Sequence, residues 1–306
     1  MIDTFYASSL EELLRLVLQC EPAIGNTLYF RGESEDYGLT ALIPSIYRDK
    51  HLAREHTYYR EMQRFNDHEF VSDKTAFDKL ARMQHYLCPT RLIDMSKDLM
   101  SAAWFALEKR QKQQAYVEDA VLYVLEIREN KIKYYDSDAV SVVANLAKTP
   151  LDNKHNIEKS KQSIWRDAIN YLGQVEEYNQ AQCRSRSYLM HDIKEEKAYF
   201  EDDIVPAHLF SVFCVKPKYS NQRVHGQKGA FLLFGMNKQD VEKPISLMEE
   251  INKPFMFHDH PIEKITKIIL DRNIKLAELE KIGVTKPYIY PELEKVSEFL
   301  KDMGIT

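Results

Sequence analysis

The sequence has few cysteines, and they lie far apart. Only four occur among the 306 residues, at Cys20, Cys88, Cys183 and Cys214, and no two of them form a Cys-x-x-Cys pair. A disulfide framework or a structural zinc site needs cysteines that are more numerous or more closely spaced. We therefore expect reduced thiols and no metal cofactor.

Long apolar runs and a strong charge of one sign are also missing. No apolar run approaches the roughly 18 residues of a membrane-spanning helix, and the N-terminus lacks a basic segment followed by an apolar one. The net charge is only −5, with a pI of about 6.1, which argues against a general nucleic-acid binder. These absences predict a cytoplasmic protein without a membrane segment.

The common catalytic signatures are absent as well. The sequence contains no P-loop, no Gly-x-Gly-x-x-Gly fingerprint, no Gly-x-Ser-x-Gly elbow and no His-Glu-x-x-His helix. Each of these patterns places particular side chains or backbone N–H groups around a reacting group. The usual nucleotide hydrolases and metalloproteases are therefore disfavoured.

The apolar residues that are present, 44% of the chain with the aromatics included, suffice for a substantial core. Apolar and β-branched runs predict strands at 120–127, 209–215, 230–234 and 265–270. Helical patterns separate them, and residues 137–200 are helical, more charged and poorer in apolar residues. We expect an α+β fold with a single mixed β-sheet core, discontinuous in sequence and surrounded by helices. It would form one domain over residues 1–306, with a helical insertion or subdomain at 137–200.

A polar turn at residues 84–96 is the centre of the pattern. Pro89 cannot continue the helix predicted over 75–86, so the chain must turn there. The turn presents His85, Thr90, Arg91 and Asp94 together, and it leads into an apolar segment, 99–107, that is typical of a buried helix. His85 is a candidate for orienting a substrate or for acid–base chemistry, although a lone histidine is more often structural.

A second polar feature ends the short strand predicted over residues 26–32. The guanidinium of Arg31 offers a bidentate fork for a phosphate or carboxylate, and Gly32 would let a ligand approach the backbone. The alternative is a buried ion pair between Arg31 and a carboxylate such as Asp94. For Arg91 and Asp94, which lie three residues apart, a structural pair is the preferred interpretation.

These segments resemble the FRG-domain family, which is named after the tripeptide that stands here as Phe30-Arg31-Gly32. The family's second block is matched at His85, Tyr86, Pro89, Thr90, Arg91, Leu92 and Asp94. Leu87 stands where the family has glycine, a residue that serves either a positive φ or close approach of a ligand. A later stretch with Arg223 and Gln227 also resembles the family.

The resemblance, taken with the order of these residues, implies a similarity to the ADP-ribosyltransferase fold and NAD as a substrate. Arg31, His85 and Gln227 would then be the catalytic residues, and Glu33 or Asp94 would supply a negative group for an oxocarbenium-like transition state. A tyrosine would stack on nicotinamide. The binding residues would be Arg31, Gly32, Tyr47, Tyr86, Thr90, Arg91, Asp94 and Arg223.

Three functional hypotheses follow. The first is an ADP-ribosyltransferase or NAD glycohydrolase, and the family context implies an effector or toxin in bacterial or phage defence, with a macromolecular target left open. The second is a non-catalytic sensor that binds a small anionic nucleotide-like ligand. In the third, the motifs form a polar core that holds a scaffold together without any ligand.

Overall fold

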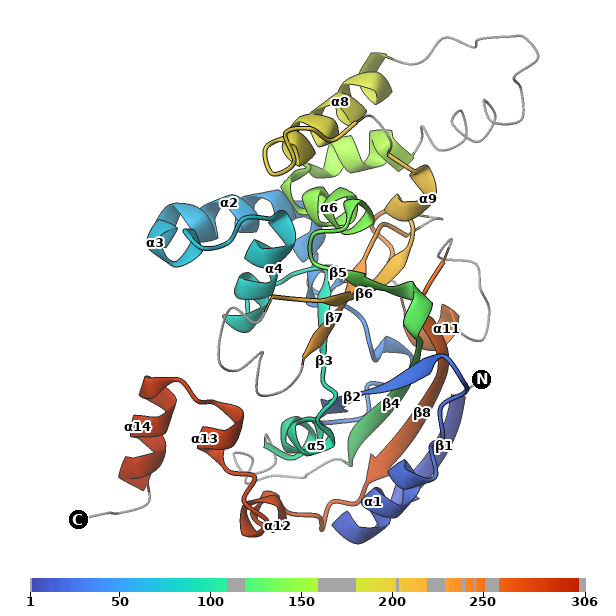
Figure 1. Cartoon of the computed structure of the whole chain (residues 1–306), viewed down its shortest axis with the longest axis vertical. Helices are drawn as coiled ribbons and strands as arrows, with labels where there is room; N and C mark the ends of the chain where they lie inside the picture. Colours follow the sequence, from blue (N-terminus) through green and yellow to red (C-terminus); the bar gives the residue numbers. More distant parts are fainter. Residues whose placement is uncertain are drawn as a thin grey trace.

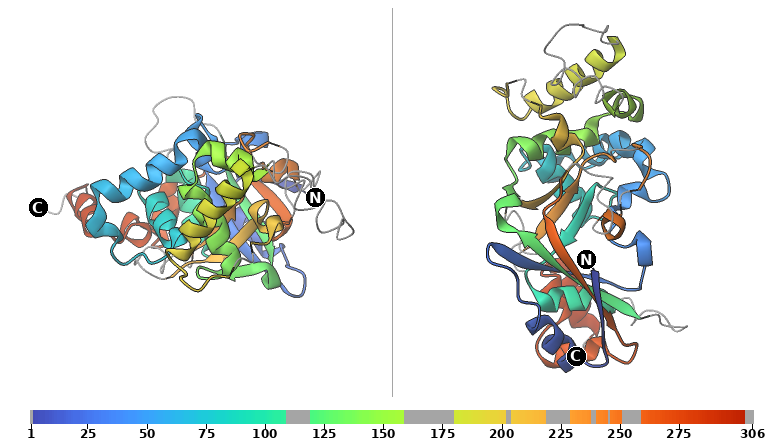
Figure 2. Two further views of the ribbon diagram at one scale, coloured as in Figure 1. Left: turned by 90° about the horizontal axis from the view of Figure 1, so that it is seen from above. Right: turned by 90° about the vertical axis from the view of Figure 1, so that its right-hand side faces the viewer.

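The computed structural model describes residues 2–108, 119–158, 180–201, 204–218, 229–237, 240–244, 246–250 and 259–302. It confirms an α+β fold whose strands are scattered along the sequence (Figure 1). The described strands form two four-stranded mixed sheets, so the expectation of one single sheet needs correction. Helices lie around both sheets (Figure 2).

The first sheet, called sheet A, has the strand order β1-β8-β4-β2. Strands β1 and β8 are parallel, and the other two pairs are antiparallel. Its strands are β1 (Ile2–Ala7), β8 (Ile262–Leu270), β4 (Ala120–Arg128) and β2 (Asn26–Glu33). Because β2 lies at the edge, only one of its sides is paired within sheet A.

The second sheet, called sheet B, has the order β3-β7-β6-β5. Strand β7 is antiparallel to both of its neighbours, and β5 is parallel to β6. Its strands are β3 (Leu92–Met95), β7 (Ala230–Phe234), β6 (Val212–Lys216) and β5 (Ile132–Tyr134). Strand β6 begins later than predicted, because Pro206 starts a short helix, α9 (Pro206–Leu209), that extends into the expected strand.

The two sheets meet where β2 passes the end of β3. Among the described residues, one bridge joins them there, between Phe30 and Ser96, with N···O distances of 2.7 and 2.9 Å. The Ser96 side chain then accepts a hydrogen bond from the Asp98 backbone, and Asp98 caps the next helix. The pairing therefore ends after one bridge, which is why the core divides into two sheets.

Sheet A has an apolar layer on each face. Phe30, Leu122 and Val124 face a cluster that includes α1 (Leu10–Leu18) and α5 (Leu99–Leu107). Tyr29 and Tyr123 belong to the other face, in the larger cluster that sheet B shares. The C-terminal helices are α12 (Leu276–Lys281), α13 (Lys286–Ile289) and α14 (Leu293–Asp302).

The remaining α-helices come from both halves of the chain, and α4 and α6 contact sheet B. They are α2 (Glu55–Phe65), α3 (Asp67–Phe70), α4 (Ala76–His85), α6 (Asp138–Asn145), α8 (Gln180–Lys194) and α11 (Leu247–Glu250). Short 3₁₀ helices occur at Gly38–Thr40, Ser45–Tyr47, His51–Arg54, Glu129–Lys131 and Leu146–Lys148. No helix within the described ranges has the length and apolar character needed to cross a membrane.

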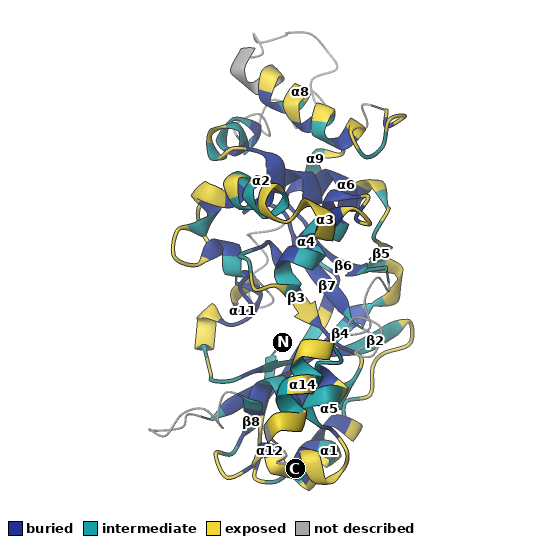
Figure 3. Ribbon diagram, turned by 90° about the vertical axis from the view of Figure 1, so that its left-hand side faces the viewer, coloured by how far each residue is buried: buried dark blue, intermediate teal, exposed yellow. Residues whose placement is uncertain are grey.

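The described parts of residues 137–200 are mainly helical and contribute to the main core. Helix α6 is buried along nearly its whole length (Figure 3), and Leu189 and Ile193 of α8 are buried in the same cluster. The insertion or subdomain expected over this range stays a prediction, as does the single domain.

Gly32 is required by the close packing of β2 against α5. A Cβ atom at this position would lie 1.9 Å from the Ala102 carbonyl oxygen and 2.7 Å from the Ala106 backbone nitrogen. Both contacts are to backbone atoms of one helix, which cannot move independently. The glycine is therefore explained by helix packing, and its expected role in ligand approach stays a prediction.

Gly32→Ala is expected to lower the free energy of unfolding by at least about 3 kcal/mol, because the strand and helix must separate to admit the methyl group. The measurement is urea denaturation followed by circular dichroism. Gly25→Ala is the control, since Gly25 has φ +83° and no atom within 4 Å of the added Cβ, so only about 1 kcal/mol of backbone strain is expected. Equal losses in the two variants would contradict the packing explanation.

Candidate functional site

Arg31 lies on β2 where the two sheets meet. Its Nε donates a hydrogen bond to Glu33 Oε1 at 3.1 Å, and its Nη1 donates to the Asp94 carbonyl at 2.9 Å. The Arg31 side chain is 24% exposed, whereas the Glu33 side chain is almost fully buried. Arg31 thus links an edge strand of sheet A to an edge strand of sheet B while remaining accessible to solvent.

The residues opposite Arg31 extend the site across sheet A. Arg31 pairs in register with Tyr123 on β4, and Tyr123 pairs with Lys267 on β8. Directly opposed residues in a sheet project from the same face. Arg31, Tyr123 and Lys267 therefore form one row, which we call the cationic row.

Two buried polar atoms near Arg31 have no hydrogen-bond partner within the described residues. They are Glu33 Oε2, an acceptor, and the Tyr123 hydroxyl, which can donate. Burial raises the pKa of Tyr123, and the nearby charges of Glu33 and Asp36 raise it further. A neutral hydroxyl that can donate thus lies beside a partly exposed guanidinium.

The third member of the row, Lys267, is held by the segment that follows β2. Lys267 Nζ donates to Asp36 Oδ2 at 2.6 Å. Burial would raise the pKa of Asp36, but the Lys267 ammonium and the Gly38 backbone N–H outweigh it and lower that pKa. Asp36 is therefore a carboxylate placed on one end of the row.

Thr90 and Asp94 are joined through Gln84 at the end of α4. Gln84 Nε2 donates to Asp94 Oδ2 at 2.9 Å, and Thr90 Oγ1 donates to Gln84 Oε1 at 2.5 Å. Thr90 is fully buried and its carbonyl accepts a hydrogen bond from the Ile46 backbone. Thr90 tightens the turn, whereas the Asp94 side chain is exposed beside Arg31.

His85 and Tyr86 lie at the same end of α4, and their rings meet edge to face with centroids 5.0 Å apart. His85 Nε2 is 3.3 Å from Glu292 Oε1, which connects α4 to the segment before α14. Tyr86 is 55% exposed, so its ring is available to a ligand. His85 has a structural partner, and its expected catalytic role stays a prediction.

The backbone conformation of Leu87 explains why the family pattern has glycine at this position. Leu87 has φ +61°, and hydrogen bonds run from Leu87 N to Gln84 O and from Cys88 N to Met83 O. This is a Schellman ending of α4, in which the left-handed residue is usually glycine. The leucine side chain is 91% exposed, so it adopts this conformation without packing against the core.

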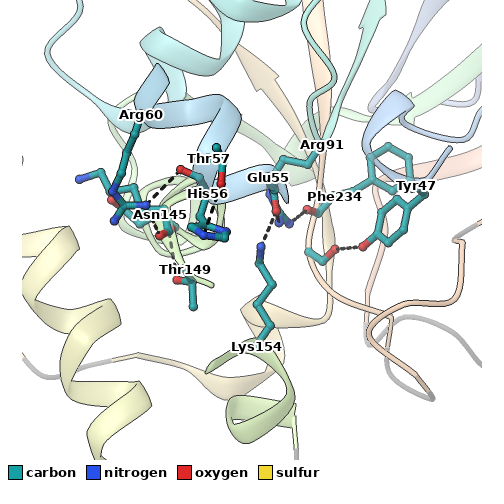
Figure 4. A network of polar contacts seen from close by, with 12 residues as sticks. Tyr47, Glu55, His56, Thr57, Arg60, Arg91, Asn145, Thr149, Lys154 and Phe234 are labelled. Carbon is teal, nitrogen blue, oxygen red and sulfur yellow. Dashed lines mark hydrogen bonds and ion pairs between the residues drawn. The ribbon is translucent and has the colours of Figure 1, made fainter. Parts of the chain in front are cut away.

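Arg91 is buried in an ion-pair network (Figure 4). Its Nε and Nη2 bind the two oxygens of Glu55 at 2.8 and 2.5 Å, and its Nη1 donates to the Phe234 carbonyl at 2.8 Å. Lys154 Nζ donates to Glu55 Oε2 at 2.6 Å. One carboxylate therefore holds two cations, and all three side chains are excluded from solvent.

This network corrects the expected pair of Arg91 and Asp94. The partner of Arg91 is Glu55, 36 residues earlier in the chain. Tyr47 is also buried beside the network, and its hydroxyl donates to the Gly235 carbonyl at 3.1 Å (Figure 4). Neither Arg91 nor Tyr47 faces the exposed surface around Arg31, and their predicted ligand contacts gain no support.

The remaining predicted residues are Arg223 and Gln227, which lie outside the described residues. The sequence did not indicate Tyr123 or Lys267 as site residues. Tyr123 stands in a continuous apolar run, and only strand register places it beside Arg31. Lys267 stands in a strand that also carries Glu263, Lys264 and Thr266, so its residue type gave no signal of the site.

Removing the shared carboxylate is expected to destabilise the fold strongly. Glu55→Gln leaves two buried cations uncompensated and should cost about 3–5 kcal/mol of unfolding free energy. Lys154→Met leaves the balanced Arg91–Glu55 pair and should cost less than about 1.5 kcal/mol. Urea denaturation at pH 7 measures both, and an equal cost would contradict the shared-carboxylate arrangement.

A pH series on the wild type and Lys154→Met tests the same network independently. Burial, assisted by Arg91 and opposed by Glu55, lowers the pKa of Lys154 to about 8. Above that pH the folded chain has released a proton that the unfolded chain keeps until near its ordinary pKa, so wild-type stability should rise between those two values. Lys154→Met lacks this rise, and parallel curves would show that Lys154 does not titrate there.

Leu87→Gly is expected to raise the unfolding free energy by about 1 kcal/mol, because glycine adopts the left-handed conformation without strain. Leu87→Ala is the matched control, since it removes the exposed side chain but keeps the Cβ, and it should change stability by less than about 0.5 kcal/mol. Thermal and urea unfolding measure both variants. A loss of stability in the glycine variant would mean that the exposed leucine makes a stabilising contact.

Comparison with known proteins gives a match to a family model. The family model of the FRG domain matches residues 26–115, which include β2, α4 and β3 with Arg31, His85, Tyr86, Thr90, Arg91 and Asp94. No curated protein and no solved structure matches the chain. The chain therefore carries an FRG domain at residues 26–115.

Proposed function

We propose that the protein binds an anionic, nucleotide-like ligand at Arg31 and that NAD is its substrate. The observation that carries this proposal is the pairing of Arg31 with Glu33 at the junction of the sheets. The guanidinium is partly exposed, so a phosphate can approach it. Asp94 borders the same junction from β3, and Tyr86 is exposed at the end of α4, whose Gln84 binds Asp94.

The chemistry proposed is cleavage of the bond between nicotinamide and ribose. Water takes up the ribosyl group, so NAD and water yield ADP-ribose, nicotinamide and a proton; a protein nucleophile in place of water would yield an ADP-ribosylated target. Positive charge develops on the ribose as the bond breaks, and a fixed carboxylate stabilises it. Glu33 is the buried carboxylate placed beside Arg31, and its Oε2 lacks a partner within the described residues.

The exposed aromatic ring at the end of α4 supports a particular arrangement. Tyr86, and not the buried Tyr47, would stack on the nicotinamide ring. Asp94 would contact a polar part of the ligand, since its side chain is exposed and held by Gln84. Roles for Gln227 and Arg223, an effector or toxin activity, a macromolecular target and the absence of a metal cofactor all stay predictions.

One observation favours the sensor as a second candidate. Glu33 Oε1 already accepts a hydrogen bond from Arg31, so the two charges compensate each other before any ligand binds. An anion that draws Arg31 away from Glu33 would change the contact of Arg31 with the Asp94 carbonyl and hence the junction of the sheets. Binding without turnover would be sufficient for such a role.

The test is to incubate the purified protein with NAD and to measure nicotinamide release and binding of ADP-ribose. Arg31→Ala should abolish both, because it removes the anion contact. Glu33→Gln should retain binding and reduce nicotinamide release by about 100-fold, because it removes only the charge that stabilises the transition state. Circular dichroism confirms that each variant is folded.

Arg64→Ala serves as the matched control, since Arg64 forms an exposed pair with Glu61 on α2, remote from the junction. Binding of ADP-ribose without nicotinamide release in the wild type would establish the sensor in place of the enzyme. Binding that Arg31→Ala leaves unchanged would overturn the assignment of this site.

A further inference from the structure

We propose that Lys267 provides a second anion subsite beside Arg31, and that Asp36 occupies this subsite in place of a ligand. The inference rests on the proposed function and specifies its ligand class: a molecule with two neighbouring anionic groups, such as a nucleotide that contains a diphosphate. The segment 34–38, which carries Asp36, then acts as a built-in competitor for that ligand. We call this segment the acidic strap.

The spacing of the cationic row supports two subsites. Arg31, Tyr123 and Lys267 stand directly opposite one another on three successive strands. Strands lie about 4.8 Å apart, so the backbones of Arg31 and Lys267 are separated by about 10 Å. Both side chains are long, and they can converge on two phosphates closer together than this once Arg31 leaves the Asp94 carbonyl and Lys267 leaves Asp36.

The middle of the row is suited to the same ligand. The Tyr123 hydroxyl is fully buried and has no acceptor within the described part of the chain. It lies between the two cations and can donate a hydrogen bond to an oxygen bound by either of them. The row therefore offers donors along its whole length, which matches the many oxygens of a diphosphate.

In this structure the Asp36 carboxylate of the acidic strap contacts the cationic row. Asp36 Oδ2 binds Lys267 Nζ at 2.6 Å, and Asp36 Oδ1 accepts a hydrogen bond from the Gly38 backbone at 2.9 Å. The strap begins after Glu33, which is paired in β2, and it ends before Leu39, whose carbonyl accepts a hydrogen bond from Ser246 at 2.6 Å. Tyr37 of the strap packs against the core, whereas the Asp36 side chain is exposed, so Asp36 can turn away from Lys267 while the strand remains paired.

The opposite face of sheet A supplies a matched comparison. Lys264, three residues before Lys267 on β8, binds Asp3 at the same distance of 2.6 Å. That pair lines a cavity of about 160 Å³ under α1, with Cys20 and Leu28 in its wall. Lys264 thus has the same charge and partner type but faces away from Arg31.

The experiment is calorimetric titration of the full chain with ADP-ribose, which has two phosphates, and with AMP, which has one. Lys267→Met should weaken ADP-ribose binding by about tenfold or more, because a charge-assisted contact is lost. The same variant should weaken AMP binding by less than about threefold, since AMP needs only Arg31. Asp36→Asn should tighten ADP-ribose binding by about twofold to fivefold, because a partly exposed ion pair no longer competes.

Lys264→Met is the control and should leave both titrations unchanged. Lys267→Gln replaces the methionine variant if the latter fails to fold, as judged by circular dichroism. Loss of binding in Arg31→Ala together with unchanged binding in Lys267→Met and Asp36→Asn would overturn the second subsite and leave the proposed function intact. A wild-type chain that binds neither ADP-ribose nor AMP would overturn both.

Discussion

The buried charge of Arg91 is the constraint on which the rest of the structure depends. A guanidinium without solvent must be compensated, and Glu55 does so with both of its oxygens. The same carboxylate binds Lys154, and Arg91 also binds the backbone of β7. One ion pair therefore fixes α2, the start of β3, the end of β7 and the helical residues around 154 relative to one another.

The residues of the FRG pattern divide into two groups with different physical roles. Gly32, Thr90 and Arg91 are determined by packing, a tight turn and a buried ion pair. Arg31, Asp94 and Tyr86 retain exposed surface, Arg31 and Asp94 at the junction of the sheets and Tyr86 at the end of α4. The first group fixes β2 against α5 and the start of β3 against α2 and β7. A functional role for the second group stays a prediction.

Much of the fold followed from local signals in the sequence. The α+β class, the turn at Pro89 and the apolar helix after Asp98 all depend on neighbouring residues, and the structure has each of them. Strand β3 and strand β1 were not predicted, because four and six residues with mixed polarity give little periodicity. The division into two sheets depends on a single bridge between Phe30 and Ser96, which no local pattern indicates.

The candidate site was less predictable because its members meet only through tertiary contacts. Arg31 was identified from its own chemistry at the end of a strand. Glu55 as the partner of Arg91, and Tyr123 and Lys267 as neighbours of Arg31, come from positions 36 to 236 residues away along the chain. A pairing over such distances depends on sheet register and helix packing, and residue type alone does not encode it.

The strand pairing also affects whether the region matched by the family model can fold without the rest of the chain. Within the region matched by the FRG family, β2 has its ladder partner in β4 and β3 has its partner in β7, and both partners lie after residue 115. Lys154, which shares the Glu55 carboxylate, lies beyond it too. A fragment cut at the limits of the family match would carry two unpaired edge strands with open hydrogen-bonding groups, a template for aggregation. We therefore expect that the region matched by the family model does not fold on its own, and that a fragment containing it must also include β4 and β7.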